Sequence, residues 1–433
     1  MRSLLPASPW GWAAVLMGLL TAALVGCAAP QPLPTAETAY PTDAWALWQP
    51  GPWLRGANIY QRRVYPELDG TLFLGPGPFG PPYTQADFDA LRQQGANWVV
   101  LSVMGPYTVA PPYGPDPRAM DHITALVDMA WRADLFVVLA VRSGPGRSEF
   151  SILREGLGDW FGPQYLHEEV WEDPAARRAW AAMWRWLALR FREHPAVVGY
   201  NLMVEPNADA VAGVDDPEAF YSRYRDTGYD WNAWYPDLVA AIRQVDPDTP
   251  ILVSPLGYAS PQWLAYLAPV DAPRVAYGVH LYEPYAYTHQ PPQQLNGLVY
   301  PGRMALVPHG TPVWFDRSAL EQEMAMLAAF RLRAGAPVAI LETGIMRWEP
   351  GAAAFMRDRL EAAERYGINY AVWMWYPDWP ALNGPEGDHA FNFRLGPTPT
   401  HFSPQPNPLW DVYRRLWARN TVRPSLWGAQ PGR

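Results

Sequence analysis

Apolar residues along this chain gather in eight short runs that are almost continuously hydrophobic, separated by longer segments of mixed polarity. Runs of this length without in-and-out alternation are typical of parallel strands that are covered on both faces. The pattern therefore predicts a largely parallel sheet. The predicted strands are residues 53–59, 97–103, 135–142, 196–205, 250–255, 275–282, 337–342 and 369–375.

Amphipathic helical patterns fill the segments between these strands. In the clearest one, residues 175–193, Asp173 can cap the first turn and Pro174 suits the first helical position. Its large apolar side chains recur at helical spacing, so we interpret its tryptophans as core residues and its arginines as the outer face. The other predicted helices are residues 84–94, 118–132, 233–245, 318–334, 352–366 and 407–419, with a short one at 261–267.

Eight strand-helix units in order predict an α/β fold of the (β/α)₈ TIM barrel type. We expect residues 47–433 to form it as a single domain. Four long segments, rich in aromatic residues, Gly and Pro, follow predicted strands, where barrels build their active sites. We expect these segments to form the rim of a cleft; they are residues 143–173, 206–232, 283–316 and 376–406.

The N-terminal residues have the features of an export signal. Arg2 lies near the start, an apolar stretch follows, and small residues precede Cys27, the only cysteine. LVGC, residues 24–27, resembles the lipobox of bacterial lipoproteins. We expect residues 1–26 to be a lipoprotein signal peptide, Cys27 to carry the lipid anchor and residues 27–46 to form a Pro-rich tether, which places the protein in the extracytoplasmic cell envelope. An ordinary secretory signal with a chance cysteine is the alternative.

Composition narrows the range of partners. The formal net charge is −9 and no basic cluster stands out, which argues against nucleic acid. Aromatic residues make up 14% of the chain, including 23 Trp and 23 Tyr, and their flat faces suit contact with sugar rings as well as core packing. We expect a monomer that binds a carbohydrate substrate and meets a membrane only through its lipid anchor.

Two carboxyl groups close equivalent strands: Glu205 ends the fourth in MVEPN, and Glu342 ends the seventh in AILETG. Barrel geometry places both at the same face. Two facing carboxyls can cleave a glycoside, with one donating a proton and the other attacking the sugar; a gap of ~5 to 5.5 Å gives retention of configuration and ~6.5 to 9.5 Å gives inversion. A helix cap or a surface ion pair is the alternative for either residue alone.

Short motifs around these residues resemble those of glycoside hydrolase family 5, the cellulase family, or of a closely related barrel glycosidase family. The resemblance covers residues 54–375, with the motifs in the family's order. LRGANIY (54–60) is similar to the first-strand RGVN signature, VEPN (204–207) to the NEP motif, GVHLYEP (278–284) with YTHQ (287–290) to the sixth strand, PVAILETG (337–344) to the strand ending in GEFG, and AVWMW (371–375) to the eighth strand.

The resemblance implies roles for particular residues. Glu205 would be the general acid/base and Glu342 the nucleophile that forms a covalent glycosyl-enzyme. His280 and Tyr282 stand two apart in a strand and therefore face the same side. Tyr282 would donate a hydrogen bond to the nucleophile, and His280 would contact the sugar or the acid/base; core packing is the alternative for both.

The eighth strand offers two candidates for the aromatic floor under the sugar, Trp373 and Trp375, with core packing as the alternative for Trp375. In the third strand the family's usual His is replaced by Arg142, which could supply a cation near the nucleophile because the family's second-strand Arg is replaced by Val100. Arg142 begins RSGPGR, residues 142–147. A tight Gly-Pro turn is as good an interpretation of that run as substrate contact.

The residue before the acid/base also departs from the family pattern. The family has an Asn there, which binds the sugar's 2-hydroxyl, and this chain has Val204. Asn201 or Asn207 could partly replace the missing amide.

No cofactor or metal is expected, since no His/Cys cluster has ligand spacing and no phosphate-binding loop is complete. The favoured hypothesis is a retaining β-glycoside hydrolase that acts on polysaccharide or oligosaccharide. A catalytically silent carbohydrate-binding lipoprotein and a transglycosylase are the alternatives. The sugar, the linkage and the choice between internal and terminal cleavage are left open.

Overall fold

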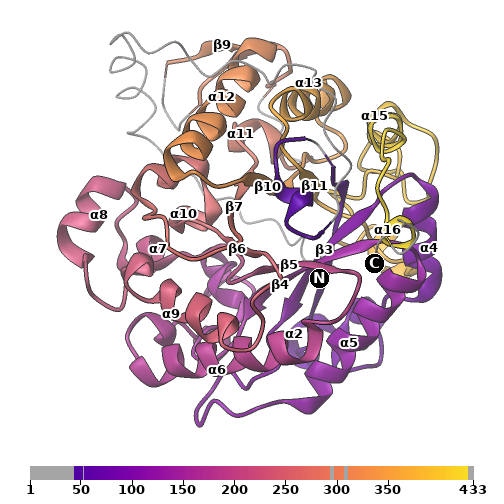
Figure 1. Ribbon diagram of the computed structural model, residues 1–433. Helices are drawn as coiled ribbons and strands as arrows, with labels where there is room; N and C mark the ends of the chain where they lie inside the picture. Colours follow the sequence, from indigo (N-terminus) through magenta and orange to yellow (C-terminus); the bar gives the residue numbers. More distant parts are fainter. Residues whose placement is uncertain (1–42, 52, 293–296, 307–310, 428–433) are drawn as a thin grey trace, which may run out of the picture.

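Eight parallel strands follow one another around a closed barrel, which confirms the predicted fold class (Figure 1). Each strand pairs with the next, and the last closes the ring on the first with Tyr370 opposite Arg55. The computed structural model describes residues 43–427 except 52, 293–296 and 307–310. The barrel strands are β1 (Arg55–Arg63), β3 (Trp98–Met104), β4 (Phe136–Ser143), β5 (Val197–Asn201), β6 (Ile251–Val253), β7 (Val275–Leu281), β10 (Val338–Thr343) and β11 (Tyr370–Val372).

Helices connect the strands and surround the barrel (Figure 1). Every predicted long helix is present, with bounds that differ from the expected ones by a few residues at most. The short segment predicted at 261–267 is the 3₁₀-helix η6 (Pro261–Tyr266). The long helices are α4 (Gln85–Gln93), α5 (Pro117–Arg132), α6 (Pro174–Phe191), α9 (Trp231–Arg243), α12 (Arg317–Ala334), α13 (Ala352–Arg365) and α15 (Pro408–Trp417).

Helix α6 shows why the sequence pattern was a good guide to the helices. The Asp173 side chain accepts a hydrogen bond from the Ala175 amide at 2.7 Å, which caps the first turn. The indoles of Trp180 and Trp184 are fully buried and donate to the backbone oxygens of Pro145 and Leu202. These tryptophans therefore anchor the helix to the barrel, as a core interpretation predicts.

The barrel interior is filled by side chains from alternate strand positions. Trp48, on the 3₁₀-helix η1 (Ala46–Trp48), enters the barrel, where its indole donates to the Val198 oxygen at 2.9 Å and its ring meets Trp98 edge-on. Val100 and Val204 belong to the same buried apolar cluster. Burying this area stabilises the barrel at roughly 25 cal/mol per Å² removed from water.

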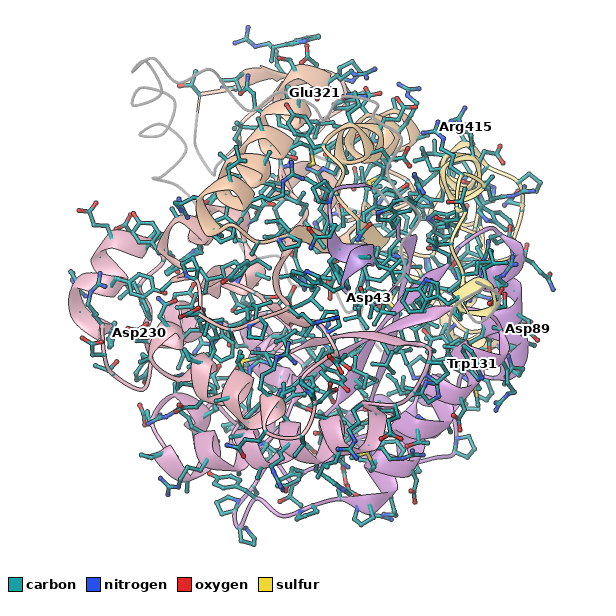
Figure 2. All side chains as sticks on the ribbon, viewed as in Figure 1. Asp43, Asp89, Trp131, Asp230, Glu321 and Arg415 are labelled. Atoms are coloured by element: carbon teal, nitrogen blue, oxygen red, sulfur yellow. The ribbon has the colours of Figure 1, made fainter. Side chains whose placement is uncertain are left out.

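Many charged side chains of the helix layer point outward, as Arg415 on α15 does in Figure 2, but Asp358 and Arg359 on α13 are buried. Side chains fill the space between this layer and the barrel (Figure 2). Among the described residues, no helix combines the length and the apolar character needed to cross a membrane.

The fourth barrel strand ends earlier than predicted, because β5 stops at Asn201 and not at Glu205. Hydrogen bonds to the neighbouring strands continue as far as the Val204 amide, which donates to the Val141 oxygen at 2.8 Å. Glu205 then takes a left-handed backbone conformation with φ of 52°. The chain therefore turns at the acidic residue itself, which a run of apolar letters does not reveal.

The long segments after the strands contain short elements of their own, and a small hairpin of β8 and β9 extends the segment after β7. The predicted leader and Cys27 lie outside the described residues, and so does most of the predicted tether. The remaining elements are α2 (Pro66–Asp69), α3 (Thr71–Leu74), β2 (Phe79–Gly80), η2 (Glu149–Ser151), η3 (Arg154–Gly156), η4 (Pro163–Tyr165), η5 (Glu169–Trp171), α7 (Ala208–Ala212), α8 (Pro217–Tyr224), α10 (Leu256–Ala259), α11 (Tyr285–Thr288), β8 (Gly302–Met304), β9 (Val313–Phe315), α14 (Pro380–Asn383) and α16 (Pro424–Trp427).

Candidate active site

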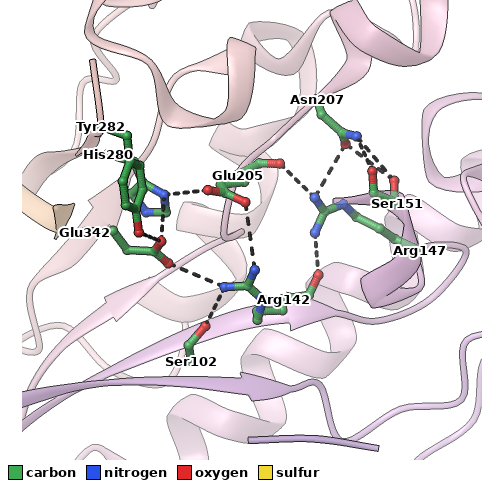
Figure 3. A network of polar contacts seen from close by, with 9 residues as sticks. All are labelled: Ser102, Arg142, Arg147, Ser151, Glu205, Asn207, His280, Tyr282 and Glu342. Carbon is green, nitrogen blue, oxygen red and sulfur yellow. Dashed lines mark hydrogen bonds and ion pairs between the residues drawn. The ribbon is translucent and has the colours of Figure 1, made fainter. Parts of the chain in front are cut away.

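Glu205 and Glu342 meet at the carboxyl ends of the barrel strands, with His280 between them (Figure 3). One carboxylate oxygen from each acid and one ring nitrogen of His280 all lie within 4.8 Å of one another. Glu342 is on β10, His280 is on β7, and Glu205 follows β5. The fold therefore brings together the two carboxyls that were predicted from the sequence to face each other.

Three side chains hold the Glu342 carboxylate. The Tyr282 hydroxyl donates to Oε2 at 2.9 Å, and an Arg142 nitrogen lies 3.4 Å from Oε1. His280 Nδ1 lies 3.4 Å from Oε2. The Glu342 side chain is only 4% exposed, so these contacts take the place of water.

Glu205 shares two of these partners but is more open to solvent. Its Oε1 is 2.9 Å from His280 Nδ1, and its Oε2 is 3.8 Å from Arg142. Its side chain is 12% exposed, so the pair reaches solvent on the Glu205 side. His280 is thus hydrogen-bonded to one acid and in ionic contact with the other.

The shared histidine and arginine set the protonation of the pair. Burial acts to raise the pKa of Glu205, but the hydrogen bond and charge of His280 outweigh it and lower that pKa. Burial raises the pKa of Glu342, against the charges of His280 and Arg142, and the neighbouring carboxylate adds to the rise. The pKa of His280 is raised because the two carboxylates outweigh its burial. A proton is therefore held strongly inside this cluster.

The Tyr282 hydroxyl is kept as a donor. Burial, together with the charge of Glu342, raises its pKa well above the usual value. The hydroxyl therefore stays protonated, and the hydrogen bond that it donates stabilises the ionised form of Glu342.

Of the two tryptophans expected under the sugar, only Trp373 lies at the site. The Arg142 guanidinium stacks over Tyr60 at 4.6 Å and over Trp373 at 5.3 Å from the ring centroids. Trp373 is partly exposed. Trp375 is 1% exposed and its indole donates to the Asp87 oxygen at 2.9 Å, so it occupies the core position that was its alternative.

The two asparagines considered as replacements for the missing amide do not face the carboxyl pair. The Asn207 amide donates to the Ser151 oxygen at 2.8 Å, and the residue is fully buried (Figure 3). The Asn201 amide donates to the Ser254 hydroxyl at 3.0 Å. Asn207 was expected to contact substrate, and this placement gives it a structural position. Val204 points into the barrel cluster and offers no polar atom.

Two residues of the site were not singled out from the sequence. Ser102 on β3 accepts a hydrogen bond from Arg142 at 3.0 Å, and its only signal was a hydroxyl within an apolar strand. Arg147 donates to the Glu205 backbone oxygen at 2.7 Å. It was visible as the end of RSGPGR, but nothing in the letters showed where its side chain points.

Glu205, His280 and Glu342 are the one set among the described residues whose spacing could hold a metal ion. The guanidinium of Arg142 already contacts both carboxylates at 3.8 and 3.4 Å. A cation bound between these carboxylates would meet that positive charge at close range. Arg142 therefore already supplies the positive charge between these carboxylates, and the set does not fit an added metal ion.

A β/α barrel with two carboxyls facing each other at the carboxyl ends of its strands is the arrangement of a barrel glycosidase. Comparison with known proteins leads to the family. A model described as Cellulase (glycosyl hydrolase family 5) matches residues 67–378. This is well over half of the chain, which therefore belongs to glycosyl hydrolase family 5, as the motifs indicated.

Similar proteins carry related names. Endoglucanase C of Acetivibrio thermocellus and Endoglucanase C307 of a Clostridium species are each 30% identical over 124 residues. The match spans 28% of this chain and only 30% of the length of those relatives.

Solved structures resemble the whole barrel. Thermotoga maritima Cel5A, in a mutant form with cellobiose, has a TM-score of 0.57 at 16% identity and covers 86% of this chain and 99% of its own. A structure described as a glycoside hydrolase has a TM-score of 0.57 at 18% identity, covering 84% and 98%. At such identities the likeness shows the fold alone.

Proposed function

We propose that this protein is a retaining β-glycoside hydrolase in which Glu205 is the general acid/base and Glu342 the nucleophile. The observation that carries the proposal is the spacing of the two carboxyls, whose nearest oxygens lie within 4.8 Å. This spacing fits the ~5 to 5.5 Å between the carboxyls of retaining enzymes. Inverting enzymes separate their carboxyls by ~6.5 to 9.5 Å to admit a water, and this pair is too close for that.

The contacts of Glu342 suit a nucleophile. Burial raises the pKa of Glu342, and Tyr282 and Arg142 oppose that rise by stabilising the charged form, which must attack the anomeric carbon. Its C–O bond to the sugar forms as the glycosidic bond breaks, which gives a covalent glycosyl-enzyme. Water activated by Glu205 then releases the sugar with its original configuration.

The acid role requires a proton on Glu205 when the leaving group departs. Because His280 lowers the pKa of Glu205, the resting proton lies on the imidazole side of their 2.9 Å contact. Transfer of that proton from Nδ1 to Oε1 yields neutral His280 and protonated Glu205. We therefore assign His280 to holding the catalytic proton until substrate binds.

The substrate is a β-linked polysaccharide or oligosaccharide. Relatives named endoglucanases support this class, as does the mannotriose complex described for Thermotoga maritima Cel5A. Trp373 supplies an aromatic face beside the carboxyl pair. Val204 removes one contact to the 2-hydroxyl, so binding of that hydroxyl depends on other groups.

A catalytically silent binding barrel is less well supported, because a pure binding protein gains nothing from two buried carboxyls held by shared cationic groups. Transglycosylation would use the same covalent intermediate, with a sugar in place of water. Export and anchoring through Cys27 remain the sequence-based prediction for where the enzyme works.

The test is a screen of the purified protein on aryl β-glycosides and polysaccharides, with Glu205→Ala and Glu342→Ala measured beside it. We expect each substitution to lower kcat by roughly 10²-fold or more. Arg415→Ala, a change on the outer face of α15, serves as the control and is expected to match the wild type. Wild-type activity in both glutamate variants would reject the proposed roles.

A further inference from the structure

The run RSGPGR folds as a tight turn that returns Arg147 toward Arg142. The amide of Gly144 donates to the Arg147 oxygen at 2.8 Å, and the amide of Arg147 donates back at 2.9 Å. The Arg147 side chain is completely buried beside the carboxyl pair (Figure 3). The turn interpretation is therefore right for the backbone, and it leaves the buried guanidinium to be explained.

Arg147 bonds to backbone oxygens on both sides of the site. It donates to the Arg142 oxygen through one nitrogen and to the Glu205 oxygen at 2.7 Å through another. The second nitrogen also reaches the Asn207 side-chain oxygen at 3.4 Å. The Arg147 side chain thus links the backbone of Arg142, which contacts both carboxylates, to the backbone of Glu205.

This arrangement is costly for the fold. The hydrogen bonds of Arg147 go to backbone oxygens and to the Asn207 amide oxygen, not to a carboxylate, and among the described residues its Nε has no hydrogen-bond partner. Burial of such a charge destabilises the fold unless hydrogen bonds and nearby opposite charges offset it, and here the charges of Glu205 and Glu168 offset it in part. Burial, together with the charge of Arg142, lowers the pKa of Arg147 to about 10. It still carries its charge at neutral pH.

The backbone that Arg147 holds is itself strained. Glu205 has φ of 52°, a left-handed conformation that is unfavourable for a residue with a side chain. The next carbonyl, of Pro206, accepts from the Tyr258 amide at 3.1 Å. These bonds fix the turn that directs the Glu205 side chain toward His280.

We propose that Arg147 is a positioning residue for the acid/base, which holds the backbone of Glu205 and of Arg142 so that the Glu205 carboxyl stays on His280. This inference rests on the proposed role of Glu205. Arg147 touches no reacting atom, and its effect is exerted through the two carbonyl groups.

A purely structural arginine and a positioning arginine differ in one measurable respect. Acid assistance matters when the leaving group is poor and matters little when it is a stable anion such as 2,4-dinitrophenolate. Loss of positioning therefore lowers kcat/KM for a poor leaving group selectively, whereas partial unfolding lowers it for all substrates equally. The value of kcat/KM reports bond cleavage in the first step, so slow release of the sugar does not mask the comparison.

The experiment compares Arg147→Lys with the wild type on a dinitrophenyl β-glycoside and an unactivated oligosaccharide of the same sugar. We expect kcat/KM to fall roughly 10- to 100-fold on the oligosaccharide, since a small displacement of a catalytic group has an effect of that size. On the dinitrophenyl glycoside we expect a change below about threefold.

The matched control is Arg243→Lys. Arg243 also donates to several backbone oxygens, including those of Asp246 and Thr249, but it does so at the opposite end of the barrel, before β6. We expect this variant to change both substrates by the same factor. If Arg147→Lys fails to fold, Asn207→Ala, which removes one acceptor of Arg147, provides a milder test with the same expected selectivity.

Glu205→Ala separates failure of this inference from failure of the proposed function. If Glu205→Ala itself shows no dependence on the leaving group, the acid role is wrong. If Glu205→Ala shows it while Arg147→Lys and Asn207→Ala affect both substrates equally or neither, the acid role stands and the positioning role of Arg147 is overturned.

Discussion

A guanidinium nitrogen of Arg142 lies 3.4 Å from the carboxylate of Glu342, at the point where β4 and β10 reach the face of the barrel. The guanidinium of Arg142 also stacks on the rings of Tyr60 and Trp373, which fixes its orientation. The second barrel strand offers no cation here, because Val100 is buried in the apolar interior and Ser102 accepts a hydrogen bond from Arg142. The third strand therefore supplies the cation beside Glu342, the proposed nucleophile, as the sequence suggested.

Replacing this cation should change the pH dependence of the reaction. Arg142→Met removes a charge that lowers the pKa of Glu342, so that pKa rises. The acid limb of kcat/KM, which reports the group that must be ionised, should move to higher pH by roughly one unit. A pH profile on an aryl glycoside measures the shift. An acid limb that stays in place would show that Arg142 does not govern ionisation of the nucleophile.

His280 should control the basic limb. In the proposed mechanism the imidazole and Glu205 together hold the catalytic proton, and the pKa of His280 is raised by the two carboxylates against its burial. His280→Asn leaves the proton to Glu205, whose pKa rises when the charge of His280 is lost but which, as a carboxyl, still releases a proton more readily than the imidazole. We expect the basic limb of kcat/KM to move to lower pH and kcat to fall roughly 10²-fold. An unchanged basic limb would show that His280 does not hold the proton that the reaction requires.

The two tryptophans of the eighth strand should behave differently. Trp373→Ala removes an exposed aromatic face beside the carboxyls and should lower kcat/KM by about 3- to 10-fold. Trp375→Phe removes a buried hydrogen bond to Asp87 and should lower the free energy of unfolding by about 1 to 3 kcal/mol, with kcat/KM unchanged. Steady-state kinetics and urea unfolding on both variants test the contrast, which the reverse pattern would contradict.

Several buried acids make the free energy of unfolding fall as pH rises through about 7 to 8. Burial raises the pKa of Glu149 and of Asp209 to about 7 and that of Glu349 to about 8. The folded protein therefore binds more protons than the unfolded chain at these pH values, and stability falls as pH rises. Histidines such as His289, whose pKa is lowered to about 3, make stability rise with pH, but only below pH ~6.5, where the unfolded chain binds their proton. We expect Tm to decrease between pH 6.5 and 8.5.

Asp209→Asn isolates one of these groups. The amide oxygen can keep the hydrogen bond that Asp209 accepts from the Gly257 amide at 3.0 Å, without a charge to bury. The loss of unfolding free energy between pH 6.5 and pH 8.5 should then be smaller than in the wild type by about 1 kcal/mol. Chemical unfolding at the two pH values measures this difference. Equal slopes for the variant and the wild type would show that Asp209 does not titrate in this range.

The barrel could be predicted from sequence because its strands are buried on both faces and therefore appear as apolar runs. The two glutamates could be placed because each closes such a run. Strand parity also placed His280 and Tyr282 together at the carboxyl pair. These inferences use only local pattern and the regular geometry of parallel strands.

The remaining parts of the site depend on contacts between distant segments. Asn207 turns inward because Ser151, from another loop, binds its amide. Trp373 and Trp375 differ because β11 ends at Val372, beyond which alternation no longer decides which way a side chain faces. The left-handed turn at Glu205 is held by Arg147, 58 residues earlier in the chain. No single stretch of sequence contains such information.

The most direct test is to trap the covalent intermediate with a 2-deoxy-2-fluoro β-glycoside that carries a good leaving group, and to map the modified peptide by mass spectrometry. The account predicts one sugar per protein, attached through an ester to Glu342. A label on Glu205, or an active enzyme that turns over its substrates yet never acquires a label, would contradict it.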